Sequence, residues 1–234
     1  MIHQIIFAGP KPEMSTRDFQ DYWVNTHAVQ FASKIPQIRK YLIDTRIHFA
    51  GDMGNPLLPH QGVAEIWLEN EAEQLASMRS KEFLEGARLD EPKWAAFWMT
   101  FALDTTAHVI VAGPPLTRNP AWVKLFLLLK RKAGIPLQTF RDYGLRVHAP
   151  VVSELPGLKR YLQCHTRDGQ YVFGEASFDA VEQLWFDDLE ALGSAVRSEQ
   201  FGVRVRASLE KFVETKYVYS LAAQEHWVIG PEPR

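Results

Sequence analysis

The sequence predicts an α+β protein made of two fused β-α-β-β-α-β repeats, whose antiparallel sheets face each other as a pseudo-two-fold α+β barrel. The first observation is an internal repeat: residues 19–42 and residues 140–162 share Phe, Asp, Tyr and His at matching positions. The second is that short apolar runs and helical patterns alternate in the same order in both halves. The third is the offset between the copies, about half the chain, since 148 − 27 = 121 separates His148 from His27.

The repeat divides the chain into two domains of similar size. We expect the first repeat over residues 1–112, a linker over residues 113–121 and the second repeat over residues 122–234. The linker is marked by its glycine and proline residues, which punctuate regular structure. A sheet of this type carries helices on one face only, so its other apolar face needs a cover. The second repeat supplies that cover within one polypeptide.

Each half is expected to begin with an apolar strand and continue into a helix. Ser15-Thr16-Arg17-Asp18 is a plausible capping box for the first helix, and Pro36 and Pro156 mark helix exits. Second helices are expected near Asn70 and Asp187. The expected strands are residues 2–8, 40–45, 62–68 and 97–103 in the first half, and residues 123–130, 157–164, 180–186 and 216–221 in the second. Tails beyond the last strands then carry His108 and His226, for which a structural role at the barrel rim is favoured.

Composition and charge exclude several classes of protein. A net charge of −2 gives no reason to expect a nucleic acid or an anionic membrane as partner. The single cysteine, Cys164, excludes an intrachain disulfide framework and is typical of a reducing compartment. The N-terminus lacks the pattern of a signal peptide, and no apolar run approaches the ~20 residues of a membrane span. We therefore expect a cytoplasmic protein.

The second half resembles the opening of an EthD-type domain of the dimeric α+β barrel (ferredoxin-like) superfamily. That family shows a strand, a Lys/Arg-Gly loop, then F-x-x-Y-W-x-x-x-H-x-P and a P-G-L-x-x-Y strand. Residues 124–162 keep most of this pattern but have Gly144 where the family has tryptophan. The first half keeps the tryptophan, as Trp23, but has Val29 where the family has the proline. The chain thus resembles a tandem duplicate of this domain.

The resemblance indicates the fold more closely than it indicates the reaction. Relatives in the superfamily include cofactor-independent monooxygenases, polyketide cyclases, muconolactone-type isomerases and dehydratases, alongside haem-binding branches. We expect a cofactor-independent enzyme, a lyase or isomerase more than an oxidoreductase, that acts on a hydrophobic aromatic or polyketide-like small molecule. The alternatives are a cofactor-independent monooxygenase and a non-catalytic barrel that binds a hydrophobic metabolite.

The candidate catalytic residues are the histidine and tyrosine kept in both copies, namely His148, His27, Tyr143 and Tyr22. A histidine titrates near neutral pH, so it can take or give a proton next to a carbonyl or phenol. A tyrosine hydroxyl could hold the developing oxyanion. Five residues separate tyrosine from histidine, which in a regular α-helix places the two side chains about 140° apart. The alternative is a core histidine bonded to the backbone.

The candidate substrate-binding residues lie on the same helices, and they are Gly144, Trp23, Phe140 and Phe19. Glycine inside a helix costs roughly 1 kcal/mol relative to alanine, so Gly144 calls for a reason. One reason is that it opens space for a ligand above His148, whereas Trp23 would narrow the equivalent space at His27. The other is that a bulky side chain from elsewhere fills the gap.

No metal or cofactor is expected. None of the eight histidines forms the H-x(3)-H or H-E-x-x-H spacing of a helical metal site. Binding of haem through a lone axial histidine is kept as an alternative. The partners expected are a hydrophobic small-molecule substrate, with no nucleic acid and no membrane, and a homodimer stays open.

Overall fold

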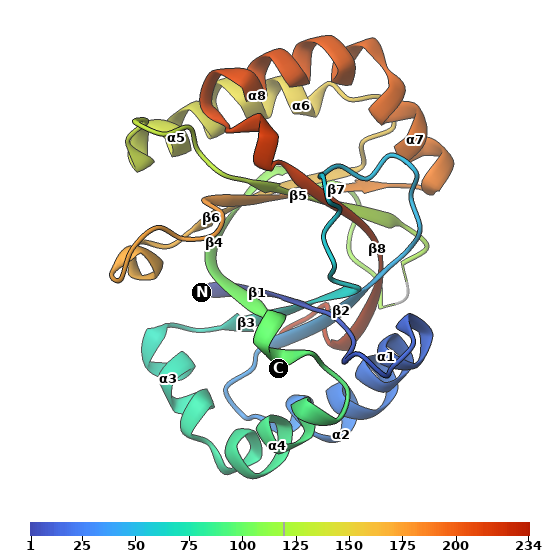
Figure 1. Cartoon of the computed structure of the whole chain (residues 1–234), viewed down its shortest axis with the longest axis vertical. Coiled ribbons are helices and arrows are strands. Elements are labelled where there is room, and N and C mark those ends of the chain that lie inside the picture. Colours follow the sequence, from blue (N-terminus) through green and yellow to red (C-terminus); the bar gives the residue numbers. More distant parts are fainter. Residues whose placement is uncertain (119) are drawn as a thin grey trace.

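The computed structural model describes residues 1–118 and 120–234 and shows a mixed α+β architecture around a closed antiparallel barrel (Figure 1). The strands follow the order β1-β3-β2-β8-β5-β7-β6-β4 around the barrel. Their bounds are β1 Ile2–Ala8, β2 Lys40–Arg46, β3 Gly62–Leu68, β4 Phe101–Val111, β5 Val123–Leu129, β6 Arg160–Thr166, β7 Ala180–Phe186 and β8 Tyr219–Ile229.

The helices form two groups on opposite sides of the barrel, one group from each half of the chain (Figure 1). The first half contributes α1 Thr16–Tyr22, α2 Ala28–Gln30, α3 Glu71–Arg79 and α4 Arg88–Asp90. The second half contributes α5 Leu137–Tyr143, α6 Ala149–Ser153, α7 Leu189–Arg197 and α8 Arg206–Phe212. No helix in the described ranges is long and apolar enough to cross a bilayer.

Each helix group is interrupted at matching places by a π-helical turn. The turns that bear on the site are Trp23–His27 between α1 and α2, and Gly144–His148 between α5 and α6. In the first of these turns the backbone N–H of Ala28 bonds to the carbonyl of Trp23, five residues earlier. Single π turns inside α-helices are frequent at functional sites, because the extra residue redirects the side chains around it.

The two longest strands, β4 and β8, join the two halves. Residues 101–105 of β4 pair with β1, and residues 105–111 pair with β6 of the other half. In the same way β8 pairs with β5 and then with β2. These strands begin later and run further than the sequence patterns predict, so His108 and His226 lie within strands and not in tails. The prediction of strands over residues 97–103 and 216–221 is wrong at both ends. The starts form 3₁₀ turns at Phe97–Met99 and Thr215–Tyr217, and pairing with the other half extends each strand beyond its predicted end.

Alternation along the strands separates two cores. Apolar side chains on one face pack against the helices of their own half, and those on the other face fill the barrel interior. The interior core includes Phe7, Phe126 and Leu221. His27 and His148 lie on the helix side of the sheets, each at the end of a π turn. The site is therefore sought between helix and sheet.

Candidate active site

A cavity of about 320 Å³ lies between the sheet and the helices of the first half. Its floor includes Tyr41 and Ala64 from β2 and β3, and its helix side includes Trp23, His27 and Trp94. Most of the remaining lining residues are apolar, with a few polar side chains among them. This volume and composition are typical of small-molecule sites, which place a few polar groups in an apolar pocket.

His27 is the titratable side chain at the centre of this site. Its Nδ1 atom lies 2.9 Å from Oδ2 of Asp90, and both side chains are buried. Its ring packs against that of Trp94, with centroids 4.8 Å apart. No described residue bonds to the other ring nitrogen, Nε2, of this cavity-lining histidine. A histidine held through Nδ1 by a carboxylate presents Nε2 for proton transfer.

Tyr22 also binds Asp90, and the π turn explains how it reaches. The Tyr22 hydroxyl donates to Oδ1 of Asp90 at 2.9 Å, and Lys93 lies 3.0 Å from the same oxygen. A regular α-helix would place Tyr22 and His27 far apart around its axis, whereas a π turn brings residues five apart closer together. The π turn Trp23–His27 thus reduces the predicted separation. Tyr22 holds the carboxylate that holds His27, and it does not line the cavity.

The protonation states of Tyr22, His27 and Asp90 follow from burial and hydrogen bonding. Burial lowers the pKa of His27, and Asp90 opposes that shift. Burial acts to raise the pKa of Asp90, but hydrogen bonds from His27, Lys93 and Tyr22 outweigh it and the pKa falls. Burial and Asp90 both raise the pKa of Tyr22, which therefore stays protonated. The resting state is a neutral imidazole beside a carboxylate, which is the form of a general base.

The second half has a different set of contacts around its histidine. Nδ1 of His148 lies 2.9 Å from the hydroxyl of Ser208, and Nε2 lies 3.4 Å from Oε1 of Glu182 without a hydrogen bond. The same Glu182 oxygen accepts hydrogen bonds from the Tyr161 hydroxyl at 2.6 Å and from the Gln163 amide at 3.0 Å. Polar side chains of the protein itself thus surround His148, which is fully buried.

Gly144 lies against side chains. A Cβ atom at this position would meet Oε1 of Gln163 at 3.2 Å, His165 at 3.7 Å and Phe212 at 3.8 Å. The space left by the missing tryptophan is thus occupied, which agrees with the second of the two explanations for Gly144. Trp23, which was expected to narrow the site, instead lines the cavity of the first half.

Comparison with known proteins identifies the family of this chain. The family model described as EthD domain matches twice, over residues 11–97 and 132–216. The chain belongs to the EthD domain family. The two matches agree with a tandem duplicate, as the sequence predicts. No curated protein is similar enough in sequence to count as a match.

Solved structures share the barrel over nearly the whole length of this EthD protein. A "putative monooxygenase" from Fusobacterium nucleatum covers 100% of this chain and 95% of its own, with 6% identity and a TM-score of 0.63. A protein of the same description from Lactobacillus acidophilus covers 98% of both chains, with 14% identity and a TM-score of 0.53. An anthrone oxidase-like protein covers 97% of this chain and 92% of its own, with 9% identity and a TM-score of 0.63. At these identities the likeness shows the fold.

The two EthD repeats therefore use their predicted residues differently. Tyr22 and His27 converge on Asp90, whereas Tyr143 packs its ring on Phe212, with centroids 4.8 Å apart. The two phenylalanines, Phe19 and Phe140, are fully buried in the helix-side cores and do not line the cavity. The residues that sequence reasoning missed are Asp90, Tyr41 and Trp94. Of these three, Asp90 had one signal in the sequence. The offset between the repeats, 208 − 90 = 118, pairs it with another polar residue, Ser208.

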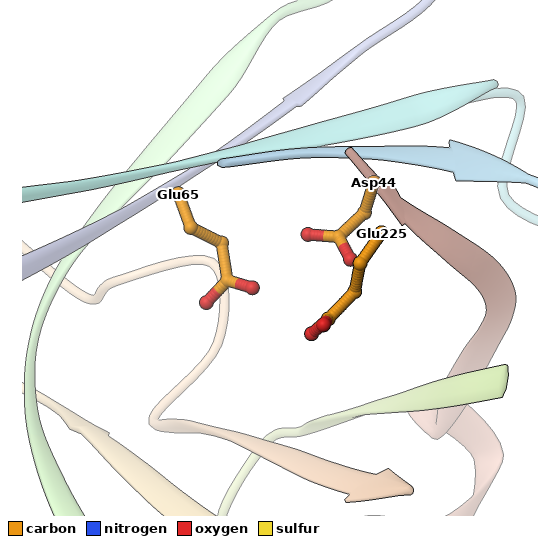
Figure 2. Close-up of side chains that lie close together, drawn as sticks. All are labelled: Asp44, Glu65 and Glu225. Atoms are coloured by element: carbon orange, nitrogen blue, oxygen red, sulfur yellow. The ribbon is translucent and has the colours of Figure 1, made fainter. Parts of the chain in front are cut away.

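A second titratable cluster lies inside the barrel. Asp44, Glu65 and Glu225 converge from β2, β3 and β8 (Figure 2). The ammonium of Lys124 lies 2.9, 2.5 and 2.7 Å from an oxygen of each, and all four side chains are at most 1% exposed. Three carboxylates so close together could otherwise hold a metal ion. Here the lysine occupies the place that a cation would take.

Burial and the neighbouring charges set the protonation of this cluster. Burial and the nearby Glu65 and Glu225 raise the pKa of Asp44 well above its usual value, although Lys124 opposes the shift. Burial also acts to raise the pKa of Glu65, but Lys124 and His3 outweigh it and lower the pKa. Cys164 lies nearby, 3.6 Å from His3, and burial raises the pKa of its thiol. A thiol kept protonated is a poor nucleophile, so Cys164 is a core residue.

Proposed function

We propose that this EthD protein is an acid–base enzyme that acts, without a cofactor, on a hydrophobic aromatic or polyketide-like small molecule. His27, and not His148, is the group that moves the proton. The observation that carries the proposal is the pairing of His27 Nδ1 with Asp90 beside an apolar cavity, with no described residue bonded to Nε2. Each half is interpreted as a ferredoxin-like unit, of which the first supplies the site.

The chemistry follows from the order of contacts. Nε2 of His27 would take a proton from a carbon next to a carbonyl or phenol, and Asp90 would stabilise the imidazolium that forms. Tyr41 lines the same cavity and could donate a hydrogen bond to the developing oxyanion. Return of the proton at another atom of the substrate completes an isomerisation. Its transfer to a departing hydroxide completes a dehydration, and its transfer to the alkoxide formed when the carbanion attacks a second carbonyl of the substrate completes a cyclisation. All three outcomes need only one titrating histidine.

A second candidate function is cofactor-independent oxygenation. It is favoured by the descriptions of the structural neighbours as monooxygenases and as an anthrone oxidase-like protein. The same proton abstraction at His27 would give the electron-rich enolate or phenolate that reacts with dioxygen. The two candidates share their first step and differ in whether dioxygen is consumed.

Anthrone is a suitable test compound because it is flat and because its acidic methylene hydrogens are conjugated with the ketone through the aromatic rings. Under anaerobic conditions in D₂O, we expect the protein to accelerate exchange of these hydrogens, measured by NMR. His27→Ala should lower the acceleration by about 10²–10⁴-fold. The matched control is His148→Ala, which changes the equivalent residue of the second repeat and should leave exchange unchanged.

The outcomes separate the hypotheses. Binding of anthrone with exchange no faster than in buffer would reject the enzyme and favour a non-catalytic barrel. Uptake of dioxygen under air that depends on His27 would favour the monooxygenase over the lyase or isomerase. Equal losses in the two histidine variants would contradict the assignment to the first repeat. Homodimer formation is a separate proposal, tested by light scattering of the full chain.

A further inference from the structure

The second repeat contains a built-in carboxylate where the first repeat has a cavity. Strand register establishes the equivalence, because Tyr41 pairs with Ile66 and Ile43 with Ala64 in the first half. In the second half, Tyr161 pairs with Leu184 and Gln163 pairs with Glu182. Glu182 therefore occupies the position of Ala64, and Gln163 that of Ile43.

The contacts of Glu182 are those expected of a ligand oxygen. Its Oε1 accepts a hydrogen bond from the Tyr161 hydroxyl at 2.6 Å and lies 3.4 Å from Nε2 of His148. The first repeat retains both counterparts, Tyr41 and His27, and both line the cavity. At the position of the glutamate it has only the methyl group of Ala64, which also lines the cavity.

We propose that the cavity of the first repeat binds a hydrophobic ligand with an acidic oxygen, a carboxylate or an enolate. This oxygen lies over Ala64, between the Tyr41 hydroxyl and Nε2 of His27. Glu182 shows, within the same chain, the position and the partners of that oxygen. The proposal deepens the proposed function by naming the substrate class. It rests on that function only because both use the same cavity of the first repeat.

The donors around the tyrosine support this assignment. In the second repeat the Gln163 amide donates to the Tyr161 hydroxyl at 2.6 Å, which leaves the hydroxyl proton for Glu182. In the first repeat burial raises the pKa of Tyr41, and the Trp23 side chain opposes the shift. Trp23 and Tyr41 line the same cavity, and the proton of Tyr41 is left for a ligand. No described residue accepts it.

The glycine of the second repeat fits the same scheme. Gly144 stands where the first repeat has Trp23, and the missing side chain makes room for Gln163. Three differences between the repeats therefore belong together. The first repeat has tryptophan, isoleucine and alanine where the second has glycine, glutamine and glutamate. In the first repeat they leave a cavity beside the unused Tyr41 hydroxyl, and in the second Glu182 accepts the equivalent hydrogen bond from Tyr161. Buried donors are satisfied in most proteins, so an unused donor indicates a ligand.

Binding of matched probes to the full chain tests the proposal. We expect 2-naphthylacetate to bind at least about tenfold more tightly than the neutral 2-naphthylacetamide, a difference of ~1.4 kcal/mol. Ala64→Glu should abolish this binding, because the introduced carboxylate takes the ligand's place. Ala64→Gln is the isosteric control. By NMR titration, the pKa of His27 should be higher in Ala64→Glu than in Ala64→Gln, since a carboxylate beside Nε2 favours the imidazolium.

The reverse change tests the second repeat and does not depend on the Ala64 variants folding. Glu182→Ala should lower the melting temperature, and millimolar propionate should restore part of it, whereas propionamide should not. The wild type, whose second repeat already contains Glu182, should gain less from propionate than this variant does. Equal effects of the two compounds on this variant would overturn the proposal, as would identical titration of His27 in the two Ala64 variants. These readouts need no turnover, so a failure of anthrone exchange alone would reject the function and keep the binding site.

Discussion

Asp90 and Ser208 occupy equivalent positions in the two repeats, and each lies 2.9 Å from Nδ1 of the histidine in its own repeat. The difference is one of charge. A carboxylate can stabilise a protonated imidazole, whereas a hydroxyl group only fixes its orientation. Since Asp90 is also held by Tyr22 and Lys93, the first repeat has the arrangement that proton transfer requires.

The first prediction concerns Asp90→Asn. Asp90 opposes the effect of burial on His27, so its loss should lower the pKa of His27 further below its usual value. The neutral base then persists to lower pH, and the acid limb of the rate profile should move in that direction while the maximal rate falls. NMR titration of His27 and the pH dependence of anthrone exchange check both parts. Ser208→Ala is the matched control and should alter neither.

The second prediction concerns the lysine inside the barrel. Lys124→Met removes the ammonium that lies within 2.9 Å of all three carboxylates, Asp44, Glu65 and Glu225. Because uncompensated charges remain buried, the free energy of unfolding should fall by about 3–5 kcal/mol. Urea denaturation measures the loss. A change of a few tenths of a kcal/mol would show that water or rearrangement relieves the cluster.

The third prediction is the pH dependence of the same cluster. The pKa of Asp44 is raised in the fold, so its contribution to stability is full below the unfolded value and is lost as pH rises. Asp44→Asn should therefore stabilise the protein at pH 7, and the gain should vanish near pH 4, the usual pKa of an unfolded aspartate. Glu65→Gln is the control of opposite sign. The pKa of Glu65 is lowered, so this variant should destabilise most at neutral pH.

The fourth prediction concerns the proposed division of the chain. A fragment of residues 1–112 would keep β1 to β4 but lose the pairings of β4 with β6 and of β2 with β8. Exposed strand edges and an uncovered sheet face promote association. We therefore expect the fragment to dimerise or aggregate in light scattering. A stable monomer would show that each repeat is an independent domain.

The fold could be predicted because its determinants repeat. The repeated tyrosine and histidine occur at the same spacing in both halves, and a proline that ends the helix follows nine residues after His27 and eight after His148. Each half therefore supports the interpretation of the other. The ends of β4 and β8 could not be predicted, since they are set by pairing with the opposite half. The local sequence pattern does not indicate which strand of the other half will pair with β4 or β8.

The site was harder to predict, for a physical reason that three residues illustrate. His27 and Tyr22 were recognised by their spacing, but Asp90 lies 63 residues after His27 and is replaced by serine in the second copy. The contact between them depends on how two helices pack on one sheet, and the alignment of Tyr22 depends on a π turn. Neither feature leaves a periodic signal in the sequence.

The last prediction concerns Gly144. Since Gln163 and Phe212 occupy the space beside it, Gly144→Trp should overpack the helix–sheet interface and destabilise the protein by about 1–3 kcal/mol. Gln163→Ile, which introduces the residue of the first repeat, should recover part of this loss when combined with Gly144→Trp, because it withdraws the nearest obstructing atom. A double-mutant cycle of unfolding free energies measures the coupling. A tryptophan variant as stable as the wild type would instead show that an open space lies above His148.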